Sequence, residues 1–318
     1  MTEPVRLDDA ALEQLIPLFK AVFGHEVPKS LLEWKYARGM GESWVVPGEG
    51  SEGPLLHCGL IYRVVAFEGG FHRAAQLVDL MAHRKSSGLS RTQSPFFALI
   101  KLILRNIRAP ENPHALAFGF PSDRAMRLGE HLGVFRAIDS LSDLVFEASK
   151  PSWHGAGCQE VGSAEVCRCV DELWFRMRRG LGDCAIGCRD AAYVFHRYVS
   201  HPLKPYRFLL VKSRFFGRIV GLAIVRDHGG GELALIDLLS SLEDVPEVFK
   251  ALQGWSSQNA CKRLTFSMTS RFARMFESCA TESRRTEFRI MANPFTSTSV
   301  LDGLENNWWL TSGDTDYR

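Results

Sequence analysis

Hydrophobic residues in the first third of the chain change from helical spacing to strand-like runs. Between residues 12 and 23 they recur every three or four positions, which predicts a helix that begins after Asp8 and Asp9 and ends at Gly24. A short second helix is expected after residues 28–30. Runs rich in Val, Ile, Leu and aromatic residues then predict strands at 43–46, 55–65 and 70–81, with a hairpin turn at 68–70.

Helical and strand-like patterns continue to alternate along the rest of the chain. Up to residue 146 we expect a helix at 95–107, a buried strand at 115–120, a helix opened by 121–123, and strands at 134–146. After residue 162 we expect helices at 163–179, 190–199, 242–257 and 270–279, with strands at 206–212, 218–227, 232–239 and 263–268. This order predicts the α/β (α+β) class, with a mixed, largely antiparallel sheet flanked by helices.

The pattern also indicates that one domain occurs twice. The residues Trp34-Lys35-Tyr36 and the strand around Asp79 recur as His196-Arg197-Tyr198 and the strand around Asp237. Asp79 precedes Phe118 by 39 positions, whereas Asp237 precedes Phe266 by only 29. The shortfall falls on one Gly-, Ser- and Arg-rich segment, residues 83–95, which the second copy lacks.

The domain organisation follows from this repeat and from one stretch rich in Gly, Ser and Pro. A length of 318 residues is typical of two domains. We expect a first domain at 1–149, a linker at 150–162 and a second domain at 163–318. Near the end, Trp308 and Trp309 could belong to a strand with a lid-like tail or to an apolar staple that docks the terminus. The two adjacent Trp residues favour the apolar staple.

Composition excludes several function classes. The chain is 46% hydrophobic and 23% charged, and its net charge of +2 gives no reason to expect a nucleic-acid partner. The eight Cys form no CxxC pair, so no metal site is expected. With no signal-peptide pattern and no apolar run of membrane-spanning length, we expect a cytoplasmic protein with reduced thiols and no membrane span.

The segment that only the first copy contains has the composition of an anion-binding turn. Gly88, flanked by Ser residues, follows a strand and precedes the helix expected near Pro95, so backbone N–H groups and a helix N-terminus can face one anion. Arg84, Lys85 and Arg91 add positive charge that matches phosphate oxygens. A solvent-exposed basic turn remains the alternative interpretation.

This segment, together with Phe118-Gly119-Phe120-Pro121-Ser122 and Leu132-Gly133-Val134-Phe135, resembles the GNAT superfamily of acyl-CoA N-acyltransferases. In that family a strand leads into an R/Q-x-x-G-x-G/A turn that cradles the CoA pyrophosphate. The resemblance covers most of residues 5–147 and, more weakly, 163–312, so it implies two tandem GNAT-like domains with a degenerate second copy. Lys85 and Ser122 depart from the family pattern.

The resemblance implies a set of site residues in the first copy. Acetyl-CoA or another acyl-CoA, as co-substrate, would contact Leu80, Met81, Ala82, Arg84, Ser87, Gly88, Leu89, Ser90, Arg91 and Ser94, with backbone N–H groups at 80–82 stabilising the thioester oxygen. Asp79 and His83 are the candidate general bases. Asp79 also has a structural interpretation, because Asp237 occurs in the copy without the turn. Trp34, Tyr36, His57 and Gln76 are candidates to line the acceptor pocket, although a core position is the favoured interpretation for Trp34.

Three functions follow as hypotheses. The first is a bacterial N-acyltransferase that moves an acyl group, acetyl or longer, from acyl-CoA to an amine of a small metabolite or sugar. The second is a catalytically degenerate protein whose two GNAT-like domains bind a ligand or partner. The third is transfer of aminoacyl groups from tRNA, which the low net charge of +2 disfavours. The sequence leaves a homodimer open.

Overall fold

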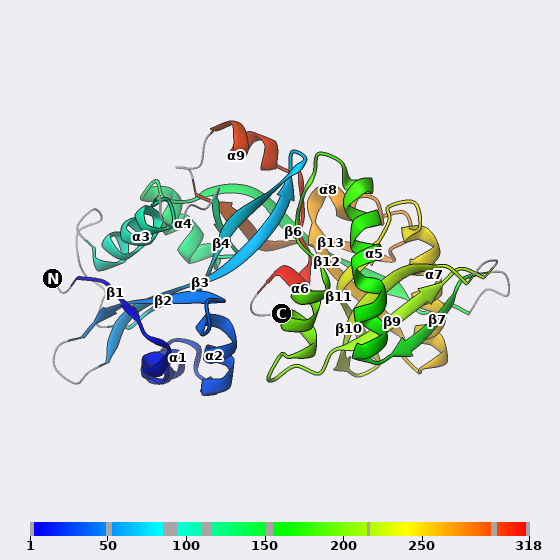
Figure 1. The fold of residues 1–318 in the computed structure, drawn as a ribbon, viewed down its shortest axis with the longest axis horizontal. Coiled ribbons are helices and arrows are strands. Elements are labelled where there is room, and N and C mark those ends of the chain that lie inside the picture. The colour runs from blue at the N-terminus through cyan, green and yellow to red at the C-terminus, as the bar shows by residue number, and fades with distance from the viewer. Residues whose placement is uncertain are drawn as a thin grey trace. The chain divides into compact units, whose positions relative to one another are not determined.

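A computed structural model describes residues 3–48, 53–84, 94–109, 116–150, 155–214, 217–293 and 298–315 (Figure 1). The chain forms two compact units. The first comprises Met1–Val64, His72–Ile138 and Phe288–Gly303, and the second comprises Val65–Phe71, Asp139–Glu287 and Leu304–Arg318. Among the described residues, no helix is both long and apolar enough to cross a membrane.

The first unit is a sheet with helices on both faces. Its strands run in the order β1 (Val5–Leu7), β2 (Gly41–Pro47), β3 (Pro54–Phe67), β4 (Gly70–Ala82), β5 (Leu116–Gly119) and β13 (Glu282–Ala292), of which the residues from Phe288 onward belong to this unit. The pairs β1–β2, β2–β3 and β5–β13 are antiparallel, and β4–β5 is parallel. Its helices are the 3-10 helix η1 (Asp9–Leu15), α1 (Ile16–Phe23), α2 (Lys29–Tyr36), α3 (Pro95–Asn106) and α4 (Asp123–His131), and α9 (Thr298–Leu304) follows β13.

Two hydrophobic clusters form the core of this unit. Helix α3 buries Leu99, Ile100, Ile103 and Leu104, a spacing that puts all four on one face, in a cluster that also contains side chains of β3, β4 and β5. A second cluster joins η1, α1 and α2 to residues of β2, β3 and β4. Each fully buried Leu contributes about 2 kcal/mol to folding, so both helical layers are firmly attached to the sheet.

The second unit repeats this order of elements. Its main strands run β6 (Arg136–Glu147), β12 (Arg263–Thr269), β11 (Glu232–Ser240), β10 (Ile219–Gly229), β9 (Arg207–Lys212) and β7 (Gly157–Val161), with β11–β12 parallel. The short strands β8 (Ala185–Gly187) and β14 (Trp308–Trp309) pair with each other. Helices α5 (Ser163–Leu181), α6 (Ala191–Val194), η3 (Phe195–Val199, a π-helix), α7 (Val245–Gln258), α8 (Ser270–Ala273) and η4 (Ser312–Asp314) complete the unit.

The expected class, a mixed and mostly antiparallel sheet flanked by helices, is confirmed. The two compact units are nevertheless not two consecutive segments of sequence. Strand β6 pairs with β12 in the second unit, although its residues precede the expected linker at 150–162, and 288–303 belong to the first unit. Hydrophobic alternation predicts that a strand is buried, but it does not identify the strand beside it.

Candidate functional site

Strands β4 and β5 of the first unit part at a defined point. Their parallel pairing runs from Ala74↔Leu116 to Leu77↔Gly119, where β5 ends, while β4 continues to Ala82. Gly119 allows this last approach, because a Cβ there would lie 2.8 Å from the Leu77 carbonyl oxygen. Among the described strands, β4 has only β3 and β5 as neighbours, so its edge beyond Leu77 has no strand beside it.

The backbone of β4 is distorted just after this point. Asp79 has a φ of 46°, in the left-handed region that Asp tolerates better than most residues. Beyond it, the N–H of His83 donates to the Leu55 carbonyl at 2.8 Å, so this end of β4 remains attached to β3. The distortion therefore lies where β4 no longer pairs with β5, while β4 stays hydrogen-bonded to β3. We call the side of β4 that no longer pairs with β5 the gap.

The Asp79 carboxylate lies in a buried polar cluster. Both of its oxygens are 2.8 Å from Lys35 Nζ, and the two side chains are only 4% and 7% exposed. The Tyr36 hydroxyl donates to the same carboxylate. Both donors come from the last turn of α2. Gly59 makes room for them, because a Cβ at that position would overlap the Tyr36 hydroxyl.

His57 holds the distorted strand from the other side. Its Nδ1 lies 2.7 Å from the Asp79 backbone oxygen and its Nε2 lies 3.0 Å from Ser43 Oγ. A carbonyl oxygen can only accept, so Nδ1 carries the proton and Nε2 accepts from Ser43. Complete burial, with a smaller contribution from the charge of Lys35 and against the opposing hydrogen bond to Asp79, lowers the pKa of His57 to about 4. His57 is therefore neutral at pH 7.

The other predicted residues of the first unit occupy different environments. Gln76 is fully buried and accepts from Arg63 Nε at 3.0 Å, and Trp34 is half-buried on α2. Around the end of β4, Met81 is buried in the core, Leu80 and His83 are half-buried, and Ala82 and Arg84 are exposed. Ser87, Gly88, Leu89, Ser90 and Arg91 lie outside the described residues.

Helix α3 follows β4 in the sequence after the connecting residues 83–94. Its N-cap is Ser94, whose side chain accepts from the Phe97 N–H at 3.2 Å. The first turn contains no acidic residue, so α3 itself supplies no negative charge at the positive end of its dipole. The predicted cofactor residues Arg84 and Ser94 border residues 85–93, which lie outside the described part of the chain.

The second unit contains a related polar cluster. The Tyr198 hydroxyl donates to Asp237 at 2.8 Å, as Tyr36 does to Asp79. Arg189 replaces the Lys: its Nε lies 3.0 and 3.1 Å from the Asp237 oxygens, and both side chains are fully buried. Strands β11 and β12 also part after a parallel pairing, at Leu235↔Phe266.

Sequence reasoning named Asp79 as a candidate base and Tyr36 as a candidate acceptor contact. It did not name Lys35, Ser43 or Arg189, which belong to the same two clusters. The signal for Lys35 was available, because the repeated triplets at 34–36 and 196–198 align it with Arg197, another cation beside a Tyr. Nothing near Arg189 in the sequence relates it to Asp237, 48 positions later.

No family model and no curated protein matches this sequence. Solved structures do match its fold. A probable N-acyltransferase from Enterococcus faecalis has a TM-score of 0.71 at 12% identity, covering 92% of this chain and 72% of that one. A GCN5-related N-acetyltransferase from Kribbella flavida has a TM-score of 0.66 at 11% identity, with 91% and 70% coverage.

A eukaryotic enzyme shows the same likeness. The Saccharomyces cerevisiae N-myristoyltransferase, solved with bound myristoyl-CoA, has a TM-score of 0.59 at 11% identity, covering 92% of this chain and 82% of its own. Each of these similarities extends over both compact units, since each covers at least 91% of the chain. The parting parallel strands, the flanking helices and these neighbours agree: the chain has the GNAT fold.

Proposed function

We propose that the protein is an acyl-CoA-dependent N-acyltransferase that moves an acyl group, acetyl or longer, to an amine of a small metabolite or sugar. The observation that carries the proposal is the parting of β4 and β5 after Leu77 and Gly119, with the distortion at Asp79 just beyond it. Strands that stop pairing leave backbone donors and acceptors that need another partner. A gap of this kind suits an elongated ligand that lies between two strands.

The residues around the gap fit the two ends of an acyl-CoA. On the inner side, backbone N–H groups at Leu80, Met81 and Ala82 would stabilise the oxygen of a thioester, which supplies the acyl group. On the outer side, Arg84 is exposed, Ser94 caps α3, and the first turn of α3 lacks acidic residues, so a pyrophosphate would meet positive potential. Ser87, Gly88, Leu89, Ser90 and Arg91 complete this proposal from their sequence alone.

The two candidate bases have different roles in this proposal. The Asp79 carboxylate is occupied by Lys35 and Tyr36, so taking a proton from an amine would require it to lose both partners. We assign Asp79 the task of holding the backbone of β4 in place. His83, half-buried at the end of β4, is the proposed general base that accepts the amine proton. Trp34 and Gln76 remain proposed acceptor contacts, and Tyr36 and His57 support the β4 backbone.

The neighbours in structure support an acyl-CoA donor. One of them holds myristoyl-CoA and another is an N-acetyltransferase, so the fold accommodates acyl chains of different lengths. Neither contributes to the choice of acceptor, because identities of 11% carry only the fold.

Calorimetric titration with CoA, acetyl-CoA and myristoyl-CoA tests the donor. We expect saturable binding that Arg84→Ala and Arg91→Ala each weaken several-fold, while Arg6→Ala, which removes an exposed cation elsewhere in the unit, leaves it unchanged. No heat with any thioester would remove the enzyme hypothesis and favour the degenerate binding protein.

The release of free CoA thiol during a screen of amines then tests the chemistry. In the reaction the amine nitrogen bonds to the acyl carbon, the carbon–sulfur bond breaks, and CoA leaves as the thiol. We expect His83→Ala to lower turnover about 100-fold or more, because it removes general-base catalysis. The affinity for the acyl donor should be retained. Unchanged turnover in this variant would exclude His83 as the base.

A further inference from the structure

The last residues of the chain lie between the two parting strands of the second unit. We call residues 308–315 the C-terminal latch. Every member of the latch is buried, including Trp308 and Trp309, which are 0% exposed, so the expected docking of this segment is confirmed. Strand pairing between β11 and β12 ends at Leu235↔Phe266, and the latch begins its contacts immediately beyond that point.

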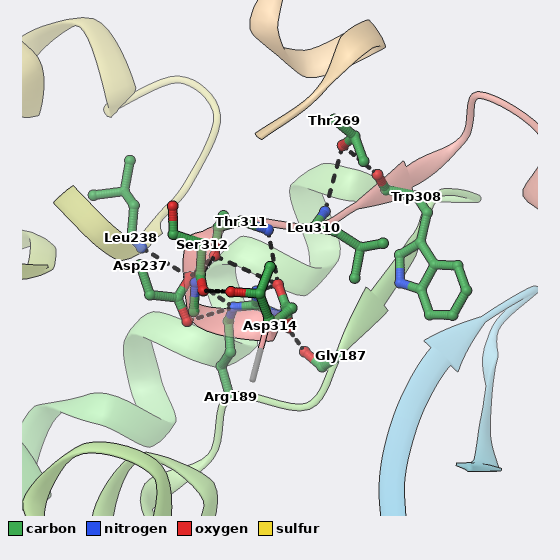
Figure 2. A network of polar contacts seen from close by, with 12 residues as sticks. Gly187, Arg189, Asp237, Leu238, Thr269, Trp308, Leu310, Thr311, Ser312 and Asp314 are labelled. Atoms are coloured by element: carbon green, nitrogen blue, oxygen red, sulfur yellow. Dashed lines mark hydrogen bonds and ion pairs between the residues drawn. The ribbon is translucent and has the colours of Figure 1, made fainter. Parts of the chain in front are cut away.

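On one side the latch pairs with β12. Met268 forms an antiparallel bridge with Thr311, and the Thr269 N–H donates to the Leu310 carbonyl at 3.0 Å. The Thr269 hydroxyl donates to the Trp308 carbonyl at 2.5 Å (Figure 2). The latch thereby supplies partners to the backbone of β12 where β11 no longer does.

On the other side the latch contacts β11. The Thr311 hydroxyl donates to Asp237 at 3.2 Å, and a Cβ on Gly313 would lie 3.2 Å from the Ile236 carbonyl and would overlap the Tyr198 hydroxyl. Only a glycine fits so close to β11. The space between β11 and β12 is therefore filled by the chain itself.

Two buried arginines hold the latch in this position. Arg189, fully buried, bonds Asp237 through Nε and Asp314 through Nη2 at 2.7 Å, so one guanidinium joins β11 to the latch (Figure 2). Arg197 donates to the carbonyls of Gly313 and Thr315 at 3.0 and 2.8 Å. Asp314 also accepts from the Thr311 N–H, which closes a capping box within the latch.

The latch lies at the position in the second unit that corresponds to the gap in the first, because β11 and β12 stop pairing at Leu235↔Phe266 as β4 and β5 stop pairing at Leu77↔Gly119. From its contacts with β11 and β12 we propose that the latch occupies, within the second unit, the counterpart of the acyl-donor gap, so that the chain binds one acyl-CoA and binds it at the first unit. This inference rests on the proposed function for its ligand, but its structural part stands on the latch contacts.

Hydrogen exchange of the full chain, with and without CoA, tests both parts. Without ligand, we expect the amides of the latch to exchange at least 10³-fold (about three orders of magnitude) more slowly than free peptide, like those of β11. With CoA, new protection is expected in β4 and α3 and none in β11, β12 or the latch. Titration should give one CoA per chain.

Asp314→Ala should release the latch, because it leaves Arg189 with one carboxylate and removes the capping box. We expect exchange in 308–315 to become about 100-fold faster. Asp302→Ala is the matched control, since it removes an exposed partner of Arg136 and should leave latch exchange unchanged. If the variant does not fold, the wild-type measurements still decide.

Each result has a defined meaning. Fast exchange of the latch in the wild-type chain, two CoA per chain, or CoA-dependent changes in β11, β12 or the latch would overturn the inference. If CoA produces no heat and no change in exchange, the proposed function falls, and slow latch exchange would still support closure of the gap between β11 and β12.

Discussion

Removing Lys35 should reveal how strongly the Asp79 cluster is coupled. In Lys35→Met the Asp79 carboxylate, 7% exposed, loses a cation that contacts both of its oxygens at 2.8 Å. Breaking a buried ion pair from one side typically costs about 3–5 kcal/mol, because the remaining charge is left without compensation. The Tyr36 hydroxyl stays in place and offsets about 1 kcal/mol at most. We therefore expect a loss of about 3 kcal/mol in the stability of the first unit.

The double variant Lys35→Met with Asp79→Asn separates charge from packing. Asn tolerates the left-handed φ of 46° and can still accept from Tyr36, but it carries no charge. Replacing both members of a buried pair is often close to neutral. We expect the double variant to lie within about 1.5 kcal/mol of the wild type, so that at least half of the stability lost in Lys35→Met is recovered.

Native-state hydrogen exchange in increasing urea is the assay, read on amides of α2 and β4, because it reports the opening of the first unit separately from the second. Lys29→Met is the control: its pair with Glu13 spans 3.3 Å between side chains that are 46% and 61% exposed, so about 0.5 kcal/mol or less is expected. A loss below about 1 kcal/mol in Lys35→Met, or no recovery in the double variant, would refute the reasoning.

Two further predictions concern pH and packing. The pKa of His57, about 4 in the folded chain and near 6.5 when unfolded, means that the unfolded chain binds the extra proton between these values. Stability should therefore rise by about 3 kcal/mol from pH 4 to pH 6.5, and urea titrations of His57→Gln should lack this slope. In α4, Gly129→Ala should lower the free energy of unfolding by about 1–3 kcal/mol, because its Cβ would overlap the Phe135 ring. Gly180→Ala in α5, where the atom nearest to the added Cβ is 3.6 Å away, should raise the free energy of unfolding by up to about 1 kcal/mol. A higher melting temperature for Gly129→Ala than for Gly180→Ala would contradict both of these packing predictions.

The sequence was most informative where the structure is local. The helix predicted from the spacing at 12–23 occurs as η1 followed by α1, and it ends at Gly24, whose φ is 80°. The hairpin predicted at 68–70 has positive φ at Glu68 and Gly69. Such features depend on residues within one turn or one strand, so their pattern is visible in a short window.

The parts that could not be predicted depend on distant residues. Asp79 was predicted as a candidate base from its place at the end of a strand. Its partner Lys35 lies 44 positions earlier, so residues near Asp79 in the sequence do not indicate that the carboxylate is occupied. The pairing of β6 with β12 joins residues more than 100 positions apart, as in Thr265↔Val145. One sequence carries no record of which buried strand or charge meets which.

Two independent features of the second unit disfavour an acyl-CoA there. Residues 83–94 connect β4 to α3, whereas only residues 241–244 connect β11 to α7. The second unit thus lacks room for a phosphate-binding turn, and its gap is also filled by the latch. Either feature alone would disfavour an acyl-CoA, by removing its anion contacts or its backbone contacts. Because the connection and the latch are separated by more than 60 residues, their agreement supports the proposal that the acyl donor binds at the first unit and not at the second.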